Sequence, residues 1–526
     1  MGDAVATRAA TRSSSFLLPL ISGVLLALSF PKYGGPAFSW FALTPLLLHL
    51  AVVAVGPRRS ARAFRAGLLC GVAYFAGTVY WTSGVMAQYG GIAAPVAMAI
   101  AALLVAFLAL FPAFFALIQT SIVARYGTAG LLLAPAIWVA TELGRTWLFG
   151  GFPWALLGYS QTRVLPIAQF ASVAGVYGLS ALVALVSASV AVAILRTDRT
   201  RWLAAVTAAV AVAACYVWGA ARLADGRLVR GSKTVRVGLV QGNVPQDVKW
   251  EPAFAGDILL RYLSATRRAA ERGAALVIWP ESSTPFYYQR SPQAEAVRQL
   301  AREKNIWILL GSDELDPVER TVSYNSAFLV RPAGTTAGIY RKVQLVPFGE
   351  YVPFRRLLFF AKPLVQAVSD FAPGTAPVML PFAGGAISTA ICYEVVYPAL
   401  IRDGILRGST LLTTITNDAW FGRSSAPYQH FDMAAMRAIE HGRYLARSAN
   451  TGISGIVDPY GRVIMTSDLF TQQVLVGDVR LIEELTLYAR VGDVVAYASV
   501  LVTVAALVGS WWTRRAAPLA RAAALA

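Results

Sequence analysis

Charged side chains are scarce in this sequence. Only 14% of the 526 residues are Asp, Glu, Lys or Arg, whereas 56% are hydrophobic. Soluble domains carry about a quarter charged residues, so this composition excludes a wholly soluble protein. The apolar residues are unevenly distributed: residues 16–222 and 494–513 are almost continuously hydrophobic, whereas residues 233–490 have ordinary globular composition. The sequence therefore predicts a membrane protein that carries one soluble domain of about 250 residues.

Cysteine and histidine are also rare, with three of each in the chain. Cys70 and Cys215 lie in apolar spans, so Cys392 in the soluble part has no partner for an internal disulfide. His430 and His441 fall on one predicted helix, and we expect His430 to be a structural hydrogen-bonding residue. So few thiols and imidazoles argue against zinc, and we predict neither a metal nor a cofactor.

Acidic residues are the minority among the charged ones. The chain has 28 Asp and Glu against 46 Lys and Arg, which gives a formal net charge of +18. Many of the arginines flank apolar spans, where they are better explained by contact with a membrane surface than with nucleic acid. No nucleic-acid motif is present, so we predict no nucleic-acid partner.

Long apolar runs are abundant and near the length needed to cross a bilayer. We predict about eight spans, the first of them a retained helix and not a removed signal peptide. Seven belong to an N-terminal bundle (1–222), and the eighth (494–513) follows the soluble domain (233–487) and precedes a tail (514–526). The spans cover residues 16–30, 37–55, 66–86, 92–121, 129–148, 165–195, 202–222 and 494–513.

Lys and Arg are concentrated in alternate loops between these spans, and such loops are cytoplasmic in most membrane proteins. The rich set contains Arg8, Arg12, Arg58, Arg59, Arg62, Arg65, Arg125, Arg196, Arg199, Arg201, Arg514, Arg515 and Arg521. The poor set contains only Lys32, Arg145 and Arg163. We therefore expect both termini in the cytoplasm and the soluble domain on the opposite, periplasmic face.

The soluble part alternates between strand and helix patterns, which predicts an α/β domain. Helices are expected near residues 252–272, 292–304, 397–406 and 427–448. Strands are expected near residues 234–243, 275–281, 307–311, 323–330, 336–340, 386–391, 410–416, 452–458 and 474–479.

Three reactive residues each follow a predicted strand: Glu281, Lys342 and Cys392. Strand ends converge on the ligand crevice of an open α/β sheet. A carboxylate that takes the thiol proton, and an ammonium that offsets charge on a tetrahedral intermediate, would equip Cys392 for acyl transfer. A lone cysteine after an apolar strand is otherwise most often a packed core residue.

The motifs around these residues resemble the nitrilase, or carbon–nitrogen hydrolase, superfamily over about residues 235–485. Two longer motifs and the eight-span layout resemble the apolipoprotein N-acyltransferase family within it. The superfamily motifs are Trp279-Pro-Glu281, Tyr340-Arg-Lys342, Ile391-Cys-Tyr-Glu394, Arg437-Ala-Ile-Glu440 and Asn450-Thr-Gly452. The longer motifs are Lys342-Val-Gln-Leu-Val-Pro-Phe-Gly-Glu-Tyr-Val-Pro353 and Thr416-Asn-Asp-Ala-Trp-Phe-Gly422.

This resemblance implies an α-β-β-α sandwich attached to a membrane bundle in the bacterial inner membrane, working as a monomer. A phospholipid would donate an acyl chain to Cys392 as a thioester. The acceptor would be the α-amine of the diacylglyceryl-cysteine that begins a bacterial lipoprotein. By position, Glu281 would be the base, Lys342 the oxyanion stabiliser and Cys392 the nucleophile.

The resemblance also implies supporting roles for Trp250, Glu350, Tyr393 and Glu394. Read without it, Glu350 is equally well a solvated loop carboxylate, and Trp250 is more often a packing residue than a substrate contact. An ionised Glu394 so close to a thiolate would raise the thiol pKa, so we expect Glu394 to bond a backbone N–H or a cation.

Two other functions remain open at this stage. A membrane-anchored amidase of the nitrilase type would use Glu281, Lys342 and Cys392 with water as acceptor, but it would not explain eight spans. A non-enzymatic lipid-binding or transport protein would not need Cys392.

The segment between Lys342 and the next strand, Val343–Pro373, is unusually long for a loop, which favours a functional lid. It carries an apolar run beside Arg355 and Arg356. Next to a membrane, this run would enter the acyl region while the arginines meet phosphates. We predict that Phe348, Phe359 and Phe360 line the acyl entry, the alternative being a place in the domain core.

Overall fold

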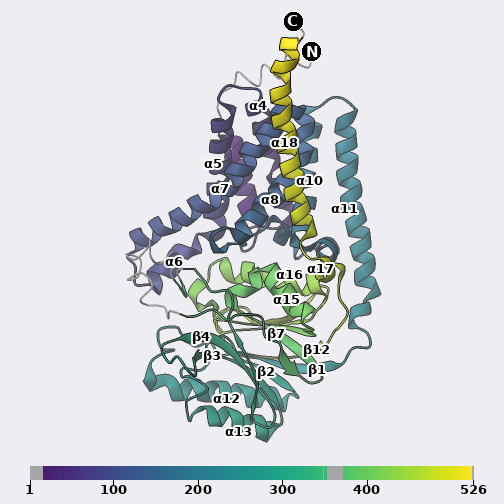
Figure 1. The fold of residues 1–526 in the computed structure, drawn as a ribbon. Helices are drawn as coiled ribbons and strands as arrows, with labels where there is room; N and C mark the ends of the chain where they lie inside the picture. Colours follow the sequence, from purple (N-terminus) through teal and green to yellow (C-terminus); the bar gives the residue numbers. More distant parts are fainter. Residues whose placement is uncertain (1–15, 348, 352–370, 524–526) are drawn as a thin grey trace. The chain divides into compact units, whose positions relative to one another are not determined.

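The computed structural model describes residues 16–347, 349–351 and 371–523 (Figure 1). The predicted lid residues Phe348, Phe359 and Phe360 lie outside the described residues. The chain divides into two compact units. One contains the residues up to Tyr80, Met98–Ala221 and the residues from Asp493 onward; the other contains Trp81–Ala97 and Arg222–Gly492.

The first unit is helical. Its principal helices are α2 (Leu17–Leu28), α3 (Pro36–Ala42), α4 (Thr44–Ala54), α5 (Arg59–Val79), α7 (Ala94–Tyr126), α8 (Ala134–Trp147), α10 (Ala171–Leu195), α11 (Arg199–Asp225) and α18 (Val494–Ala523). Within the described residues, four helical stretches are long and apolar enough to span a membrane, or five if α5 and α6 (Trp81–Gln88) form one bent span. The runs predicted at 92–121 and 129–148 belong to one such stretch, Ala94–Gly150, and α2 and Val494–Ser510 are shorter apolar helices. A membrane protein with several apolar helices is thus supported, and the number eight stays a prediction.

Small residues allow the helices of this unit to pack closely. A Cβ atom built on Gly67 of α5 would lie 2.3 Å from the carbonyl oxygen of Pro112 in α7, and one on Gly71 would lie 2.6 Å from the Cα of Ala109. A Cβ on Gly23 of α2 would lie 2.3 Å from the carbonyl oxygen of Cys70. Backbone approach of this kind is how apolar helices associate where burial of apolar surface gives little driving force.

The second unit contains two six-stranded sheets with helices outside each (Figure 1). The first sheet has the order β12-β1-β2-β3-β4-β5, and the second has the order β11-β10-β9-β8-β7-β6. Helices α12 (Ala255–Glu271) and α13 (Ala294–Lys304) cover the first sheet, and α15 (Pro398–Leu406) and α16 (Ala426–His441) cover the second. This is the α-β-β-α sandwich that the resemblance implied.

The strands of the first sheet are β1 (Thr234–Gln241), β2 (Leu276–Ile278), β3 (Trp307–Leu315), β4 (Ser323–Val330), β5 (Thr336–Arg341) and β12 (Gln473–Arg480). Those of the second are β6 (Leu380–Phe382), β7 (Gly385–Ile391), β8 (Leu411–Thr416), β9 (Leu445–Ala449), β10 (Gly455–Val457) and β11 (Val463–Thr466).

Successive side chains of the strands point alternately into two layers of hydrophobic core, one between the sheets and one under the helices. Val237 and Leu239 of β1 pack between the sheets, whereas Val240 packs under the helices. In β3, Leu309 faces the other sheet while Ile308 and Leu310 face the helices. Successive side chains of a strand point to opposite faces, so a strand covered on both sides is apolar throughout.

Strand direction brings the ends of distant strands together. β1, β2 and β3 are parallel to one another, and so are β7, β8 and β9. Glu281 follows β2, Cys392 follows β7 directly, and Asn417 follows β8 directly. In the antiparallel pair of β4 and β5, the Lys342 N–H donates to the carbonyl of Asn325 at 2.9 Å.

The predicted helix near 427–448 is wrong beyond His441. Gly442 adopts a left-handed conformation with φ of 61° and ends α16, and the chain continues into β9. Glycine takes this conformation without a Cβ clash, which is why it so often follows a helix. The predicted strand at 452–458 is shorter, at Gly455–Val457, and the strands β6, β9 and β11 were not predicted.

Candidate active site

Cys392 is the first residue of a short 3-10 helix, Cys392–Val396, directly after β7. Its φ is 52°, in the left-handed region that non-glycine residues seldom occupy. Such a conformation persists only where the surroundings impose it, and it is common at functional sites. The residue is 7% exposed, so the thiol lies in a nearly enclosed place.

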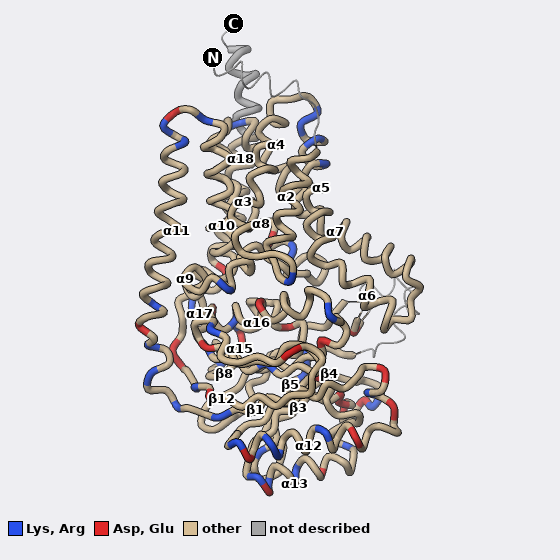
Figure 2. Tube along the Cα trace, turned by 180° about the vertical axis from the view of Figure 1, so that it is seen from behind, with Lys and Arg blue, Asp and Glu red and all other residues tan. Residues whose placement is uncertain are grey.

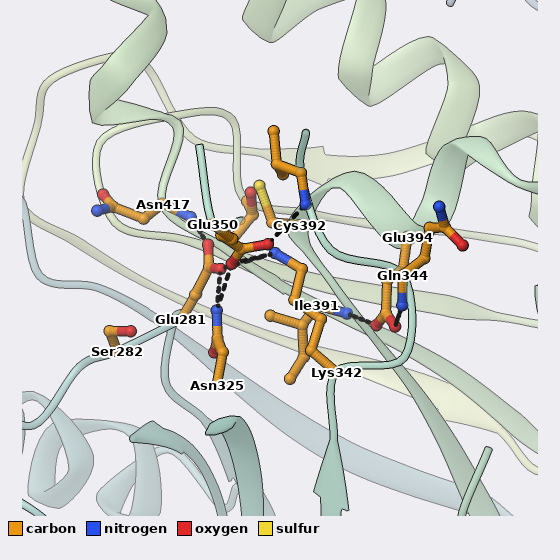
Figure 3. Close-up of polar contacts among 12 residues, drawn as sticks. Glu281, Ser282, Asn325, Lys342, Gln344, Glu350, Ile391, Cys392, Glu394 and Asn417 are labelled. Carbon is orange, nitrogen blue, oxygen red and sulfur yellow. Dashed lines mark hydrogen bonds and ion pairs between the residues drawn. The ribbon is translucent and has the colours of Figure 1, made fainter. Parts of the chain in front are cut away.

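Lys342 lies between two carboxylates close to this cysteine (Figure 3). Its Nζ is 2.8 Å from Oε1 of Glu350 and 3.4 Å from Oε1 of Glu281. All three side chains are buried. Buried charges are tolerated only when they are paired and hydrogen-bonded, so this cluster is a strongly constrained arrangement. The reading of Glu350 as a solvated loop carboxylate is therefore wrong.

Neutral donors hold the two carboxylates in place. The Asn325 side chain donates from Nδ2 to Oε1 of Glu281 at 2.7 Å and to Oε1 of Glu350 at 3.1 Å. The Asn417 backbone N–H donates to Oε2 of Glu281 at 2.9 Å, and the Val346 backbone N–H donates to Oε2 of Glu350 at 2.8 Å. Each carboxylate therefore has a fixed direction before any substrate arrives.

The electrostatics keep the thiol protonated and the lysine charged in the resting site. Burial raises the pKa of the Cys392 thiol, Glu281 raises it further, and Lys342 opposes both. For Lys342, burial disfavours the ammonium, but the carboxylates of Glu350 and Glu281 outweigh burial and raise its pKa. A thiol of this kind needs a base at the moment of attack.

Glu394 is buried and bonded mainly to the backbone. Its Oε1 accepts from the Tyr340 hydroxyl at 2.8 Å and from the backbone N–H groups of Val343 and Gln344 at 2.6 and 3.0 Å. Its Oε2 accepts from the Ile391 N–H at 2.8 Å. Burial raises the pKa of Glu394 to about 7, although the backbone donors oppose that rise. The expectation that Glu394 bonds a backbone N–H or a cation is confirmed for the backbone N–H.

The two other candidates differ in exposure. Trp250 is 47% exposed, and its indole ring lies 5.6 Å from the ammonium of Lys249. Tyr393 is buried, and its ring packs edge-on against Tyr397 with centroids 5.3 Å apart. The structure thus brings Glu281, Lys342, Glu350 and Cys392 together, with Tyr393 adjacent and Trp250 at the surface.

Two residues near the site, Lys249 and Asn325, have no sequence signal of their own. Lys249 is buried, and its Nζ donates to the carbonyl of Glu281 at 3.3 Å. Burial lowers the pKa of Lys249 to about 8, with Glu281 and Asp313 acting against it. Asn325 lies inside a strand, where nothing marks it as a site residue. Asn417 and Asp418 lie in the quoted motif Thr416–Gly422, which is the signal that points to them.

Residues 16–347, 349–351 and 371–523 contain no group of three or more His, Cys, Asp or Glu that could hold a metal ion. The arrangement around Cys392 instead offers a nucleophile, a carboxylate base and a fixed cation.

Comparison with known proteins matches both parts of the chain. Residues 236–485 match the carbon–nitrogen hydrolase family, and residues 22–189 match the apolipoprotein N-acyltransferase N-terminal domain. An apolipoprotein N-acyltransferase from Geobacter metallireducens is 41% identical over 494 residues, covering 92% of this chain and 93% of the relative. One from Methylococcus capsulatus is 34% identical over 489 residues, covering 91% and 93%. Among solved structures, an amidase from Nesterenkonia sp. is 24% identical with a TM-score of 0.38, covering 51% of this chain and 95% of that chain.

Proposed function

The chain belongs to the apolipoprotein N-acyltransferase family, and we propose that it acylates lipoproteins by way of a thioester on Cys392. The acyl donor is a membrane phospholipid. The acceptor is the N-terminal amine of the diacylglyceryl-cysteine of a bacterial apolipoprotein. The names of the relatives support lipoprotein N-acylation, and the chemistry of the site supports the covalent route.

The first half-reaction loads the enzyme. Glu281 takes the proton of the Cys392 thiol while the sulfur attacks the carbonyl carbon of a phospholipid ester. The positive Lys342 stabilises the negative oxygen of the tetrahedral intermediate. The carbon–oxygen bond then breaks, the lysophospholipid oxygen takes the proton from Glu281, and the acyl group remains on sulfur as a thioester.

The second half-reaction transfers the acyl group from the enzyme to the acceptor. The amine of the lipoprotein attacks the thioester carbonyl and gives a proton to Glu281. The carbon–sulfur bond breaks, an amide forms, and the Cys392 sulfur recovers its proton from Glu281. Atoms and charges balance without any cofactor, and one carboxylate serves as base and acid in turn.

One observation carries this proposal: the contact of Lys342 with both Glu281 and Glu350 beside a cysteine in a left-handed turn. A packed core cysteine needs neither the strained backbone nor three buried charges next to it. Every group in the scheme comes from one chain, and we propose a monomeric enzyme.

We place the helical unit in the bacterial inner membrane and the sandwich domain on the periplasmic side. The beginning of α5 and the link between α10 and α11 lie at the same end of the helical unit, and Lys and Arg gather there (Figure 2). Positive charge at one end favours the cytoplasmic side for that end. A periplasmic active site would meet lipoproteins after their export.

The reaction is tested by mass spectrometry of the purified protein in phospholipid. Wild type is expected to gain one acyl mass on Cys392, and Cys392→Ala to gain none. Adding a diacylglyceryl-cysteine peptide should remove that mass and yield a triacylated peptide. The same peptide with an acetylated amine should leave the acyl-enzyme intact. Acyl-enzyme that decays to free fatty acid equally fast with either peptide would contradict the transferase and favour the amidase-type alternative.

The topology is tested with two single exposed positions. Val318 in the sandwich domain is 91% exposed, and Val55 between α4 and α5 is 84% exposed. In intact cells stripped of their outer membrane, a membrane-impermeant maleimide should label Val318→Cys and spare Val55→Cys, relative to the unsubstituted chain. Labelling of Val55→Cys alone would reverse the assignment.

A further inference from the structure

His430 contacts the backbone of Cys392 and takes no part in the reaction described above. It belongs to α16 and is fully buried. Its Nε2 is 3.1 Å from the carbonyl oxygen of Cys392. The other ring nitrogen, Nδ1, is 3.1 Å from Oδ1 of Asp418 and 3.0 Å from Nη2 of Arg447.

The contacts fix which nitrogen carries a proton. A backbone carbonyl can only accept, so Nε2 must be protonated and must donate to Cys392. This holds whether the ring is neutral, with Nδ1 accepting from Arg447, or charged, with Nδ1 donating to Asp418. Burial and Arg447 lower the pKa of His430, which favours the neutral ring with its proton on Nε2.

The far side of the ring is clamped by a buried ion pair. Nη2 of Arg447 is 2.9 Å from Oδ2 of Asp418, and both side chains are fully buried. The Thr416 hydroxyl donates to Oδ1 of Asp418 at 2.8 Å. The His430 ring is therefore held from one side by Asp418 and Arg447 and bonds the nucleophile's backbone from the other.

Holding the Cys392 carbonyl fixes more than one group. The peptide between Cys392 and Tyr393 is planar, and in a trans peptide the C=O and the N–H point in opposite directions. Fixing the carbonyl toward His430 therefore fixes the Tyr393 N–H to point away from it. In other enzymes with a nucleophile on a sharp strand-to-helix turn, the N–H after the nucleophile is an oxyanion donor.

We propose that His430 is a positioning residue whose Nε2–H bond to the Cys392 carbonyl sets the Cys392–Tyr393 peptide, so that the Tyr393 N–H assists Lys342 in stabilising the oxyanion. This inference rests on the proposed covalent function. His430 is not the base, because its ring nitrogens are engaged by Cys392, Asp418 and Arg447.

The segment Thr416–Asp418 links this support to the base. Asp418 pairs with Arg447, which donates to Nδ1 of His430, and the backbone N–H of the preceding Asn417 donates to Glu281. One turn at the end of β8 thus sets the position of the base directly and that of the nucleophile through His430. This arrangement explains why residues of the Thr416–Gly422 motif that react with nothing belong to the site.

Substituting His430 by Gln or Asn distinguishes the loss of the hydrogen bond to Cys392 from the loss of side-chain volume. In His430→Gln, the side-chain amide nitrogen reaches the place of Nε2 and keeps a donor for the Cys392 carbonyl. In His430→Asn, the side-chain amide reaches only the place of Nδ1, where its oxygen can accept from Arg447, and the Cys392 bond is lost. His441→Asn is the matched control, because His441 is also fully buried on α16 and neither of its ring nitrogens has a hydrogen-bond partner in the described part of the chain.

The two readouts are the rate of Cys392 acylation and the rate of its alkylation by iodoacetamide, both followed on the Cys392 peptide by mass spectrometry. Only acylation develops an oxyanion. His430→Asn is expected to slow acylation about 10²-fold, the usual effect of losing one oxyanion donor, and to leave alkylation nearly unchanged. His430→Gln and His441→Asn should acylate at close to the wild-type rate.

Equal losses in both rates for His430→Asn would make His430 general scaffold and overturn the proposal, as would equal acylation by the Gln and Asn variants. If His430→Asn does not fold, His430→Met, which fills the site without a donor, takes its place with the same expectation. Acylation is measured with phospholipid and with a p-nitrophenyl ester. A wild type that reacts only with the ester would refute the phospholipid donor, while the Gln–Asn comparison would still decide the role of His430.

Discussion

Glu350 and Glu394 lie near the same cysteine but are held in different ways. Glu350 faces a charged side chain, with Lys342 Nζ at 2.8 Å, and receives one backbone N–H bond, from Val346. Glu394 receives three backbone N–H bonds and one from the Tyr340 hydroxyl. The first carboxylate balances the charge of a lysine side chain, whereas the second holds pieces of backbone together.

This difference separates two tasks that a buried carboxylate performs. The negative charge of Glu350 keeps Lys342 ionised, and Lys342 pairs with both Glu350 and Glu281. A change at Glu350 should therefore alter the rate of acylation. The oxygens of Glu394 join the turn at Cys392 to the chain that leaves β5, so a change at Glu394 should alter stability. Backbone N–H donors hold fixed positions in the fold, which suits a structural role for Glu394.

The largest effect is expected at the nucleophile that both carboxylates serve. Cys392→Ala should abolish acyl transfer and leave the domain folded, because it removes one buried atom from a small side chain. Cys392→Ser should be nearly inactive, since Glu281 would face a much less acidic hydroxyl. Transfer to a diacylglyceryl-cysteine peptide is the measurement, with thermal unfolding as the control. Appreciable turnover by the alanine variant would contradict the covalent mechanism.

Glu350→Gln should give the next largest effect. The amide keeps the shape and can still accept from Val346, but Lys342 is left with Glu281 as its partner. A tighter Lys342–Glu281 pair makes Glu281 a poorer base, and we expect acylation to slow by about 10²-fold, the scale of a general-base contribution. Single-turnover acylation measures this loss. A rate close to that of wild type would assign Glu350 to the scaffold, like Glu394.

Glu394→Gln should mainly reduce stability. The four donors around Glu394 all require acceptors, so the amide NH₂ must face at least one N–H in either orientation. An unsatisfied buried donor costs about 1–3 kcal/mol. The melting temperature should fall, while the acylation rate per folded molecule changes far less than in Glu350→Gln. An acylation loss as large as that of Glu350→Gln, without a change in melting temperature, would remove the distinction between the two carboxylates.

The smallest effect is a pH dependence of stability that comes from Glu394. Its pKa rises from 4.5 to about 7 on folding because of burial, so the folded protein binds more protons than the unfolded chain between these values. The contribution of Glu394 is therefore fully present below pH 4.5 and is lost as the pH rises through about 7. Unfolding of wild type and Glu394→Gln across this range should show the wild-type advantage shrinking with rising pH. A growing advantage would mean that the backbone donors outweigh burial.

The classes of structure and the candidate site residues could be predicted from the sequence alone. Long apolar runs cannot be soluble surface, and strand patterns between helical ones indicate an α/β domain whichever strands pair. Glu281, Lys342 and Cys392 were recognisable because each follows a strand, and strand ends lie at the edge where ligands bind. The motif resemblance then identified Glu350 as part of the same site, which spacing alone left undecided.

The folded structure is needed to see which groups meet at that edge. Asn325 bridges Glu281 and Glu350 because β4 lies beside β5, and the Asn417 N–H reaches Glu281 because the two sheets pack face to face. His430 bonds the Cys392 carbonyl from α16, which ends at His441. The helical pattern of the sequence had predicted a longer helix. Sequence patterns record the direction of each side chain from its own backbone. They carry no record of the backbone donors that a neighbouring strand or helix presents, and those donors orient the base and the nucleophile here.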